Sequence, residues 1–133
     1  MFLNQLNESE KEAFLSLGVH ASNADGDFAE EEKAMLQEYC KEMDIDSFDV
    51  NNVKSMDEII SLFASSEVTI KRIVLLEILG LLLSDNLFDE LEESFINDFT
   101  KKIGLEISDV EKEKKLLKKY LEVYKEMCDA IYL

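Results

Sequence analysis

Apolar residues recur along most of this chain at intervals of three and four positions, the spacing of an α-helix that buries one face. The interval is clearest over residues 29–43, where one set of apolar side chains falls on a single face (Met35, Leu36, Tyr39, Cys40 and Met43). The same spacing predicts further helices over residues 9–22, 55–63, 68–84, 89–102 and 109–131. In the segment 68–84 the few polar residues are scattered around the circumference. We therefore expect this helix at the centre of the fold, surrounded by the others.

Residues that start and stop helices mark several of these boundaries. Ser9 with Glu12 and Ser55 with Glu58 form the capping-box pattern, in which a serine oxygen accepts from the backbone and a glutamate reaches back. Gly104 is expected to end the helix 89–102 in the left-handed conformation. The last helix is expected to be capped by residues 108–111 and to turn one apolar set inward (Val110, Leu117, Leu121, Tyr124, Cys128 and Ile131).

Composition favours a helical fold throughout. The 133 residues include no proline and only four glycines, and apolar residues make up 47%. Proline and glycine are the strongest helix breakers, so a chain with so few of them can be helical nearly throughout. We expect one all-α domain over residues 1–133, with six or seven helices and a core that needs no disulfide.

The connection between the first two long helices, residues 24–32, has a second copy at residues 84–92. A shift of sixty positions aligns three residue types: Asp25 with Asp85, Phe28 with Phe88, and Glu32 with Glu92. The same shift aligns Gly26 with Asn86, the two residue types that most readily adopt a left-handed backbone. We interpret this as a decayed internal duplication with units of about 9–46 and 68–106, and we expect both phenylalanines to be core anchors.

The first connection matches the second half of a calcium-binding EF-hand loop. If Asp25 and Gly26 are loop positions five and six, Glu32 is the carboxylate at position twelve, but position one is Ala21. A complete EF-hand is therefore not expected. If the two helix pairs face each other, four carboxylates could share one divalent cation, Ca²⁺, Mg²⁺ or Mn²⁺, with Asp27 as a further ligand (Asp25, Glu32, Asp85 and Glu92).

A purely structural role explains the same carboxylates. An aspartate before a turn glycine satisfies nearby backbone amides, and a glutamate in a first helical turn complements the helix dipole. Both interpretations remain open at the level of the sequence.

The net charge of the chain indicates which classes of partner it favours. The formal net charge is −16, which disfavours nucleic acid and anionic membranes and favours cations or basic proteins. Five lysines form the one basic segment, at positions 112, 114, 115, 118 and 119, and we expect them on a solvated face that pairs with the acidic helices. The apolar run 68–83 is too short and too interrupted by charges to span a bilayer.

Few residues point to catalysis. His20 is the only histidine, no serine or cysteine stands in a nucleophile motif, and there is no glycine-rich phosphate loop. Cys40 and Cys128 lack metal-ligand spacing and stand among apolar residues, so we expect free thiols in a reducing cytoplasm. No signal peptide is expected from residues 1–6. We expect a binding protein rather than an enzyme.

The motif Ala-Asp-Gly-x-Phe-x-x-x-Glu, formed by Ala24, Asp25, Gly26, Phe28 and Glu32, follows an amphipathic helix and returns about sixty residues later. It resembles the TerB-like family, which includes the tellurite-resistance protein TerB and the N-terminal cytosolic domain of DjlA-type co-chaperones. The resemblance covers roughly residues 6–107. It implies an all-helical fold with internal pseudo-symmetry, a bacterial cytosolic setting and a divalent-cation site at the paired acidic loops.

The second copy of the motif keeps Asp85, Phe88 and Glu92 but has Asn86 in place of the glycine, and Leu87 and Leu91 stand beside its acidic residues. Two functions follow from the sequence. One is a cytosolic metal-binding module in a stress response such as tellurite resistance, and the other is a helical adaptor with structural carboxylates and a basic protein partner.

Overall fold

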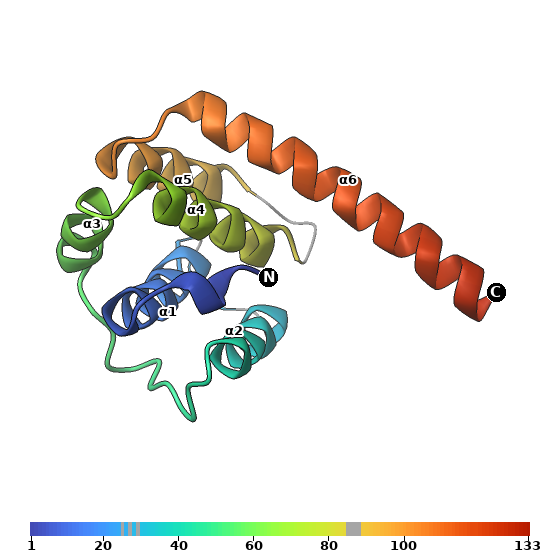
Figure 1. Ribbon diagram of the computed structural model, residues 1–133, viewed down its shortest axis with the longest axis horizontal. Coiled ribbons are helices and arrows are strands. Elements are labelled where there is room, and N and C mark those ends of the chain that lie inside the picture. Colours follow the sequence, from blue (N-terminus) through green and yellow to red (C-terminus); the bar gives the residue numbers. More distant parts are fainter. Residues whose placement is uncertain (25, 27, 29, 85–88) are drawn as a thin grey trace.

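The computed structural model describes residues 1–24, 26, 28, 30–84 and 89–133. These residues form helices and no strands, as the sequence predicts. The short 3-10 helix η1 (Leu3–Gln5) precedes six α-helices: α1 (Glu8–Ser22), α2 (Glu30–Glu42), α3 (Met56–Ala64), α4 (Val68–Leu83), α5 (Glu90–Lys102) and α6 (Ile107–Tyr132). Figure 1 shows a body of packed helices from which the C-terminal half of α6 projects.

Two helix starts differ from the prediction. The capping box of α1 is formed by Asn7 and Glu10, since Asn7 Oδ1 accepts from the Glu10 amide at 2.8 Å and Glu10 Oε1 accepts from the Asn7 amide at 2.9 Å. The predicted pair, Ser9 and Glu12, lies inside the helix. Asparagine caps as well as serine does, and a glutamate three residues later completes the box.

The last helix also begins earlier than predicted. Glu106 and Asp109 form its capping box, so α6 starts at Ile107 rather than after residue 108. By contrast, α3 begins as predicted, with Ser55 Oγ accepting from the Glu58 amide at 3.2 Å.

Two helices end in the same way. Gly104 has a φ of 92°, as predicted, and the amide of Leu105 reaches back to the carbonyl of Thr100 at 3.0 Å. Asp44 has a φ of 59°, and the amide of Ile45 reaches back to the carbonyl of Cys40 at 2.8 Å. Both are Schellman caps, in which a left-handed residue lets the chain fold back over the last turn. The sequence indicated only the cap that contains glycine.

The two helix pairs α1/α2 and α4/α5 have matching bounds. α2 and α5 each contain 13 residues and start sixty positions apart, and α1 and α4 also start sixty positions apart. Leu36 and Ile96, which are also sixty positions apart, are both buried.

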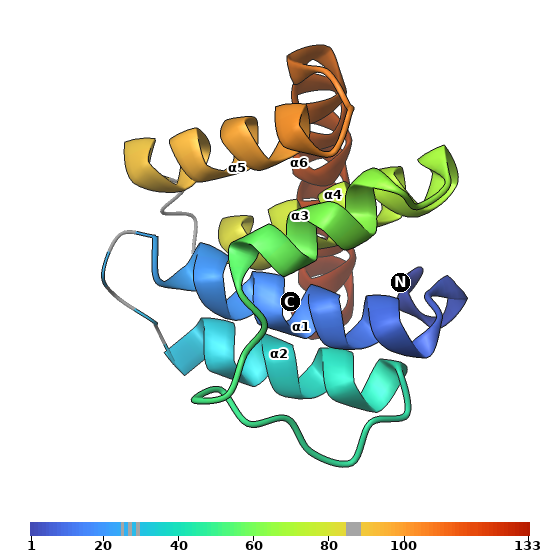
Figure 2. The same ribbon diagram turned by 90° about the vertical axis from the view of Figure 1, so that its left-hand side faces the viewer.

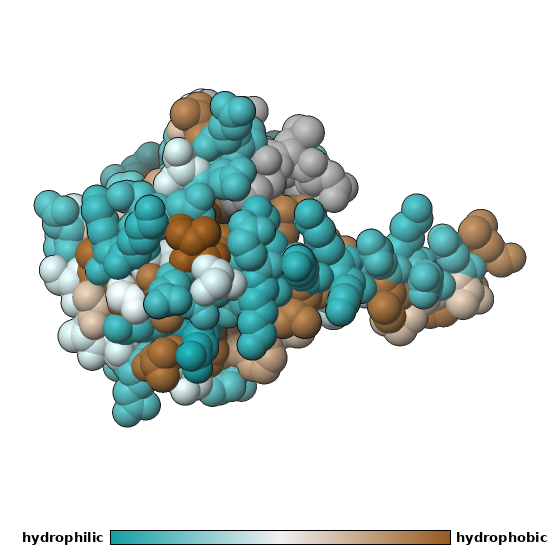
Figure 3. Space-filling model, turned by 90° about the horizontal axis from the view of Figure 1, so that it is seen from above, coloured by the Kyte–Doolittle hydropathy of each residue, from teal (hydrophilic) through white to brown (hydrophobic). Residues whose placement is uncertain are grey.

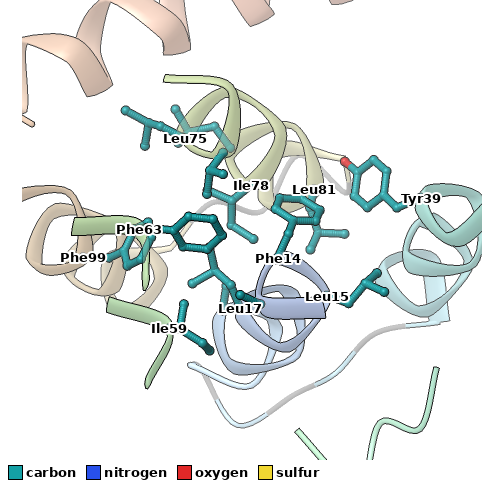
Figure 4. Packing of buried hydrophobic residues seen from close by; sticks show 14 of the residues in the cluster. Phe14, Leu15, Leu17, Tyr39, Ile59, Phe63, Leu75, Ile78, Leu81 and Phe99 are labelled. Atoms are coloured by element: carbon teal, nitrogen blue, oxygen red, sulfur yellow. The ribbon is translucent and has the colours of Figure 1, made fainter. Parts of the chain in front are cut away.

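Helix α4 packs against each of the other helices, and α1 packs against α2, α3, α4 and α5. The core between them contains three fully buried phenylalanines, Phe14, Phe63 and Phe99. The rings of Phe63 and Phe99 meet edge to face, with centroids 6.4 Å apart and planes at 86° (Figure 4). Such aromatic pairs stabilise beyond the area they bury, so this contact joins α3 to α5.

Phe28 packs against the core while staying partly exposed, with Lys33 Nζ 5.5 Å above its ring. Phe88 lies outside the described residues. His20 has a structural role, since its Nε2 donates to the carbonyl of Lys54 at 2.8 Å. The Lys54 amide in turn donates to Ser16 Oγ at 3.0 Å, so the segment before α3 is held on α1.

Candidate functional site

Two of the five predicted metal ligands belong to the described residues. Glu32 lies in the first turn of α2 and Glu92 in the first turn of α5, and each is only 2% exposed. The Glu92 amide donates to Asp89 Oδ1 at 2.8 Å, and Glu92 Oε1 accepts from the Asp89 amide at 3.3 Å. Glu92 therefore has the helix-capping role that the sequence left open.

Asp25, Asp27 and Asp85 lie outside the described residues. Gly26, between the first two, has a φ of 82°, which agrees with the predicted left-handed turn. The ends of α1 and α4 and the starts of α2 and α5 lie on the same side of the molecule (Figure 2). Within the described part of the chain, no three histidine, cysteine or acidic side chains gather as a metal site would require.

The second candidate site is on α6, where the prediction of an inward face is wrong for the C-terminal half. Val110 and Leu117 are buried, but Leu121, Tyr124 and Ile131 are exposed, and Cys128 is half-buried. The physical reason is length: α6 has 26 residues, about 39 Å at 1.5 Å per residue, and its C-terminal half passes the edge of the body (Figure 1).

Together with the buried Leu117, five of the exposed residues form one continuous face, which we call the apolar face of α6 (Leu117, Tyr120, Leu121, Tyr124, Met127 and Ile131). The rings of Tyr120 and Tyr124 stack along it, with centroids 6.3 Å apart. In Figure 3 the projecting arm carries hydrophobic side chains at its tip and along one edge, and hydrophilic side chains on the opposite edge.

A groove of about 320 Å³ continues the apolar face onto the body. It lies between α2, α4 and α6 and is lined mainly by apolar side chains (Met1, Met35, Tyr39, Leu76, Glu77, Gly80, Leu83, Ser84, Leu117, Tyr120 and Leu121). Because Leu117, Tyr120 and Leu121 belong to both, the groove and the apolar face form one surface.

Met1, Tyr39 and Glu77, which line the groove, belong to a polar cluster. The N-terminal ammonium of Met1 pairs with Glu42 Oε1 at 2.9 Å and with buried Glu77 Oε1 at 3.1 Å. Burial lowers the pKa of this amino group, but the hydrogen bonds to Glu42 and Glu77 outweigh that effect, so the pKa is raised. The Tyr39 hydroxyl donates to the Glu77 carbonyl at 3.1 Å, and burial raises the pKa of Tyr39.

Sequence reasoning missed this groove. The available signal was Glu77, a charged residue within the apolar run 68–83. A buried carboxylate needs a partner, and that partner is the N-terminus, which is distant in sequence.

Charge is distributed unevenly along α6. Lysines 112, 114, 115, 118 and 119 form its middle, and Glu122, Glu126 and Asp129 follow toward its end. Lys114 Nζ pairs with Glu93 on α5 at 3.9 Å and with Glu111 at 3.7 Å, so part of the basic segment meets an acidic helix as predicted. Lys118 and Lys119 are exposed.

Glu113 faces α4 from the same helix. Burial and the nearby Asp109 raise the pKa of its carboxyl group to about 8, although Arg72 and Lys112 act in the opposite direction. It therefore carries a proton at neutral pH.

The helices that the structure describes include none long and apolar enough to cross a membrane. Comparisons of the chain with protein-family models, with curated proteins and with solved structures give no match.

Proposed function

We propose that this chain is a helical protein-interaction module, a binding protein rather than an enzyme, that docks a partner helix along the apolar face of α6 and in the adjoining groove. The observation that carries the proposal is the continuity of these two surfaces through Leu117, Tyr120 and Leu121. Soluble monomers rarely expose contiguous apolar patches beyond a few hundred Å². The largest exposed apolar patch of a monomer is often functional, which supports a binding site on α6.

The spacing of the face selects a helix as the partner. Leu117, Tyr120, Tyr124 and Met127 recur at intervals of three and four, which is how an amphipathic helix presents anchors to a groove or to another helix. The rest of the chain, residues 1–106, carries the whole net charge of −16, because α6 contains six lysines and six acidic residues. Basic side chains around the partner's apolar contact are therefore favoured.

The proposal is tested by capturing partners from a cytoplasmic extract with matched variants. Tyr124→Ser with Met127→Ser removes two exposed anchors, and Lys125→Ser with Glu126→Ser changes the neighbouring polar face equally. We expect the parent and the polar-face variant to retain the same proteins and the apolar-face variant to lose them. Equal capture by all three, with unchanged helical content, contradicts the proposal.

A second function is proposed from the two acidic connections: a divalent cation held by Asp25, Glu32, Asp85 and Glu92, with Asp27 as a further ligand. It is favoured by Glu32 and Glu92, which are both buried in the first turn of equivalent helices. In this proposal the helix pairs α1/α2 and α4/α5 are a true duplication around a central α4. The setting would be that of the TerB-like family, a cytoplasmic stress response.

The cation proposal is tested by thermal unfolding in chelator and in Ca²⁺, Mg²⁺ or Mn²⁺. A ligand that binds only the folded state raises its melting temperature. No change at millimolar concentrations of any of the three contradicts a cation function and leaves the interaction function as it stands.

A further inference from the structure

The apolar face of α6 has the seven-residue spacing of a coiled-coil seam. Leu117, Tyr124 and Ile131 are seven positions apart, and Tyr120 and Met127 fill the intermediate positions. Residues 118–127 and 129–133 are exposed, so the seam continues from the buried Leu117 into solvent. Side chains in such a seam insert between those of a second helix.

The area fits a second protein chain. Five side chains of the face are exposed, two of them aromatic, and if each presents about half of the 150–250 Å² of an aromatic side chain they offer at most roughly 500 Å² per copy. A stable dimer buries about 800 Å² per partner. The half-buried Met35, Leu76 and Leu83 of the groove supply further apolar area next to the face.

The charge pattern of α6 disfavours a parallel pair of copies. Residues 112–119 contain five lysines and one glutamate, whereas residues 122–129 contain three acidic residues and one lysine. Two parallel copies would set the basic segment against itself, and like charges in contact are unfavourable. Two antiparallel copies that cross near Tyr124 keep the two basic segments apart and set Lys118 and Lys119 of each beside Asp129 of the other.

The net charge of the two bodies also favours antiparallel pairing. Residues 1–106 carry a net charge of −16 in each copy, so two bodies repel each other. An antiparallel pair holds them at opposite ends of the paired helices, while a parallel pair brings them side by side.

We propose that the apolar face of α6 binds α6 of a second copy of this chain, antiparallel and centred near Tyr124. The inference rests on the proposed function and names its partner. In this dimer the Met127–Ile131 end of each α6 lies beside Leu117 and Tyr120 of the other copy, at the mouth of its groove.

The first test is sedimentation equilibrium of the full chain over roughly 10–100 µM, the range in which a micromolar dimer forms. We expect a dimer for the parent and for the polar-face variant Lys125→Ser with Glu126→Ser. Tyr124→Ser with Met127→Ser should raise the dissociation constant by roughly 30-fold or more, as the loss of central anchors does. Both positions are exposed, so the fold of the body is unaffected, which circular dichroism checks. A monomeric parent, or an apolar-face variant that still dimerises, overturns the inference.

The second test determines whether the two α6 helices are parallel or antiparallel. It uses a short bismaleimide that links cysteines. Cys40 is buried and Cys128 is half-buried on α6. In a parallel pair Cys128 of one copy lies beside Cys128 of the other, so the parent is linked into dimers. In the antiparallel pair the two Cys128 residues lie apart, and linking requires Tyr120→Cys, which faces Cys128 of the other copy. Tyr120→Cys with Cys128→Ser then gives no linked dimer. Linking of the parent overturns the antiparallel arrangement.

The two proposals fail differently. If the parent is monomeric and the apolar-face variant loses captured proteins, the inference is overturned and the proposed function stands. If the parent is monomeric and capture is equal for all variants, both are overturned.

Discussion

Leu117 and Tyr124 lie two turns apart on the same face of α6, yet Leu117 is 8% exposed and Tyr124 is 54% exposed. Between them the helix leaves the body, and the apolar pattern of its sequence continues without change. The pattern therefore continues past the point where this chain buries it. The proposed partner helix would cover that surface.

Substitutions at these two positions should separate the stability of the fold from association. Leu117→Ala removes a core side chain and should cost about 2–5 kcal/mol of unfolding free energy. Tyr124→Ala should change it by less than about 0.5 kcal/mol in dilute solution, where chains are monomeric. Urea unfolding below about 1 µM measures both. Equal losses at the two positions would show that Tyr124 is packed within its own chain.

The sequence predicted the helices well because each carries its own local signals. The spacing of apolar residues located all six α-helices, and Ser55 and Gly104 marked two ends correctly. Boundaries failed where several residues competed as caps: Asn7 replaced Ser9 because either side chain can accept from the first turn. The cap at Asp44 was missed because aspartate adopts the left-handed conformation less readily than glycine and is common at many other positions, so it gives no strong sequence signal.

The sites were harder to predict because they depend on tertiary position. Periodicity identifies one face of α6 but does not say what covers it, so Tyr124 and Ile131 were assigned to the core. The contact between Met1 and Glu77 joins residues far apart in sequence, and no local pattern predicts it. Asp25, Asp27 and Asp85 lie outside the described residues, so the cation site stays a prediction.

Glu113 should give the chain a dependence of stability on pH. Its pKa is raised from 4.5 to about 8 on folding, first by burial and then by Asp109. The folded chain therefore holds this proton where the unfolded chain has lost it, so the contribution to stability is complete below pH 4.5 and is lost as the pH rises through 8. Glu113→Gln does not ionise and should be more stable than the parent above pH 8, by about 1 kcal/mol because partial exposure screens the charge.

Urea unfolding of the parent and of Glu113→Gln at pH 4.5 and pH 9 measures this difference. The exposed neighbour Glu111→Gln serves as the control and should show no comparable change between the two pH values. If the unfolding free energy of Glu113→Gln depends on pH as that of the parent does, the Glu113 carboxylate is exposed to solvent.

The amino group of Met1 should stabilise the chain in its charged form. Burial lowers the pKa of this amino group, but Glu42 and Glu77 raise it by more than burial lowers it. The pKa is therefore raised from 8.0. The contribution is therefore complete below pH 8 and is lost as the pH rises through the higher value of the folded chain. Acetylation of Met1 should lower the melting temperature at pH 7, and the difference should shrink as the pH rises above 8 and through the raised pKa of the folded chain. An acetylated chain with an unchanged melting temperature at pH 7 contradicts the pairing.

Phe99, in the core, and Phe28, at its edge, should differ in their contribution to stability. Phe99 is 1% exposed and contacts Phe63, so Phe99→Ala should cost about 3–5 kcal/mol. Phe28 is partly exposed, and Phe28→Ala should cost less, about 1–2 kcal/mol. Chemical unfolding ranks the two variants, and the reverse order would mean that the connection before α2 is packed more tightly than α5.

The acidic connections give the last prediction. If Asp25 and Asp85 share a cation with Glu32 and Glu92, the carboxylates repel one another when no cation is bound, and neutralising two of them relieves that repulsion. Asp25→Asn with Asp85→Asn should therefore melt higher than the parent in chelator and should gain nothing from added Ca²⁺, Mg²⁺ or Mn²⁺. The control is Asp46→Asn with Asp49→Asn, two acidic residues in the segment before α3, which should keep the cation response of the parent. If Asp25→Asn with Asp85→Asn instead melts lower than the parent in chelator, the aspartates are turn and helix caps, because a neutral side chain then loses hydrogen bonds that the carboxylate made.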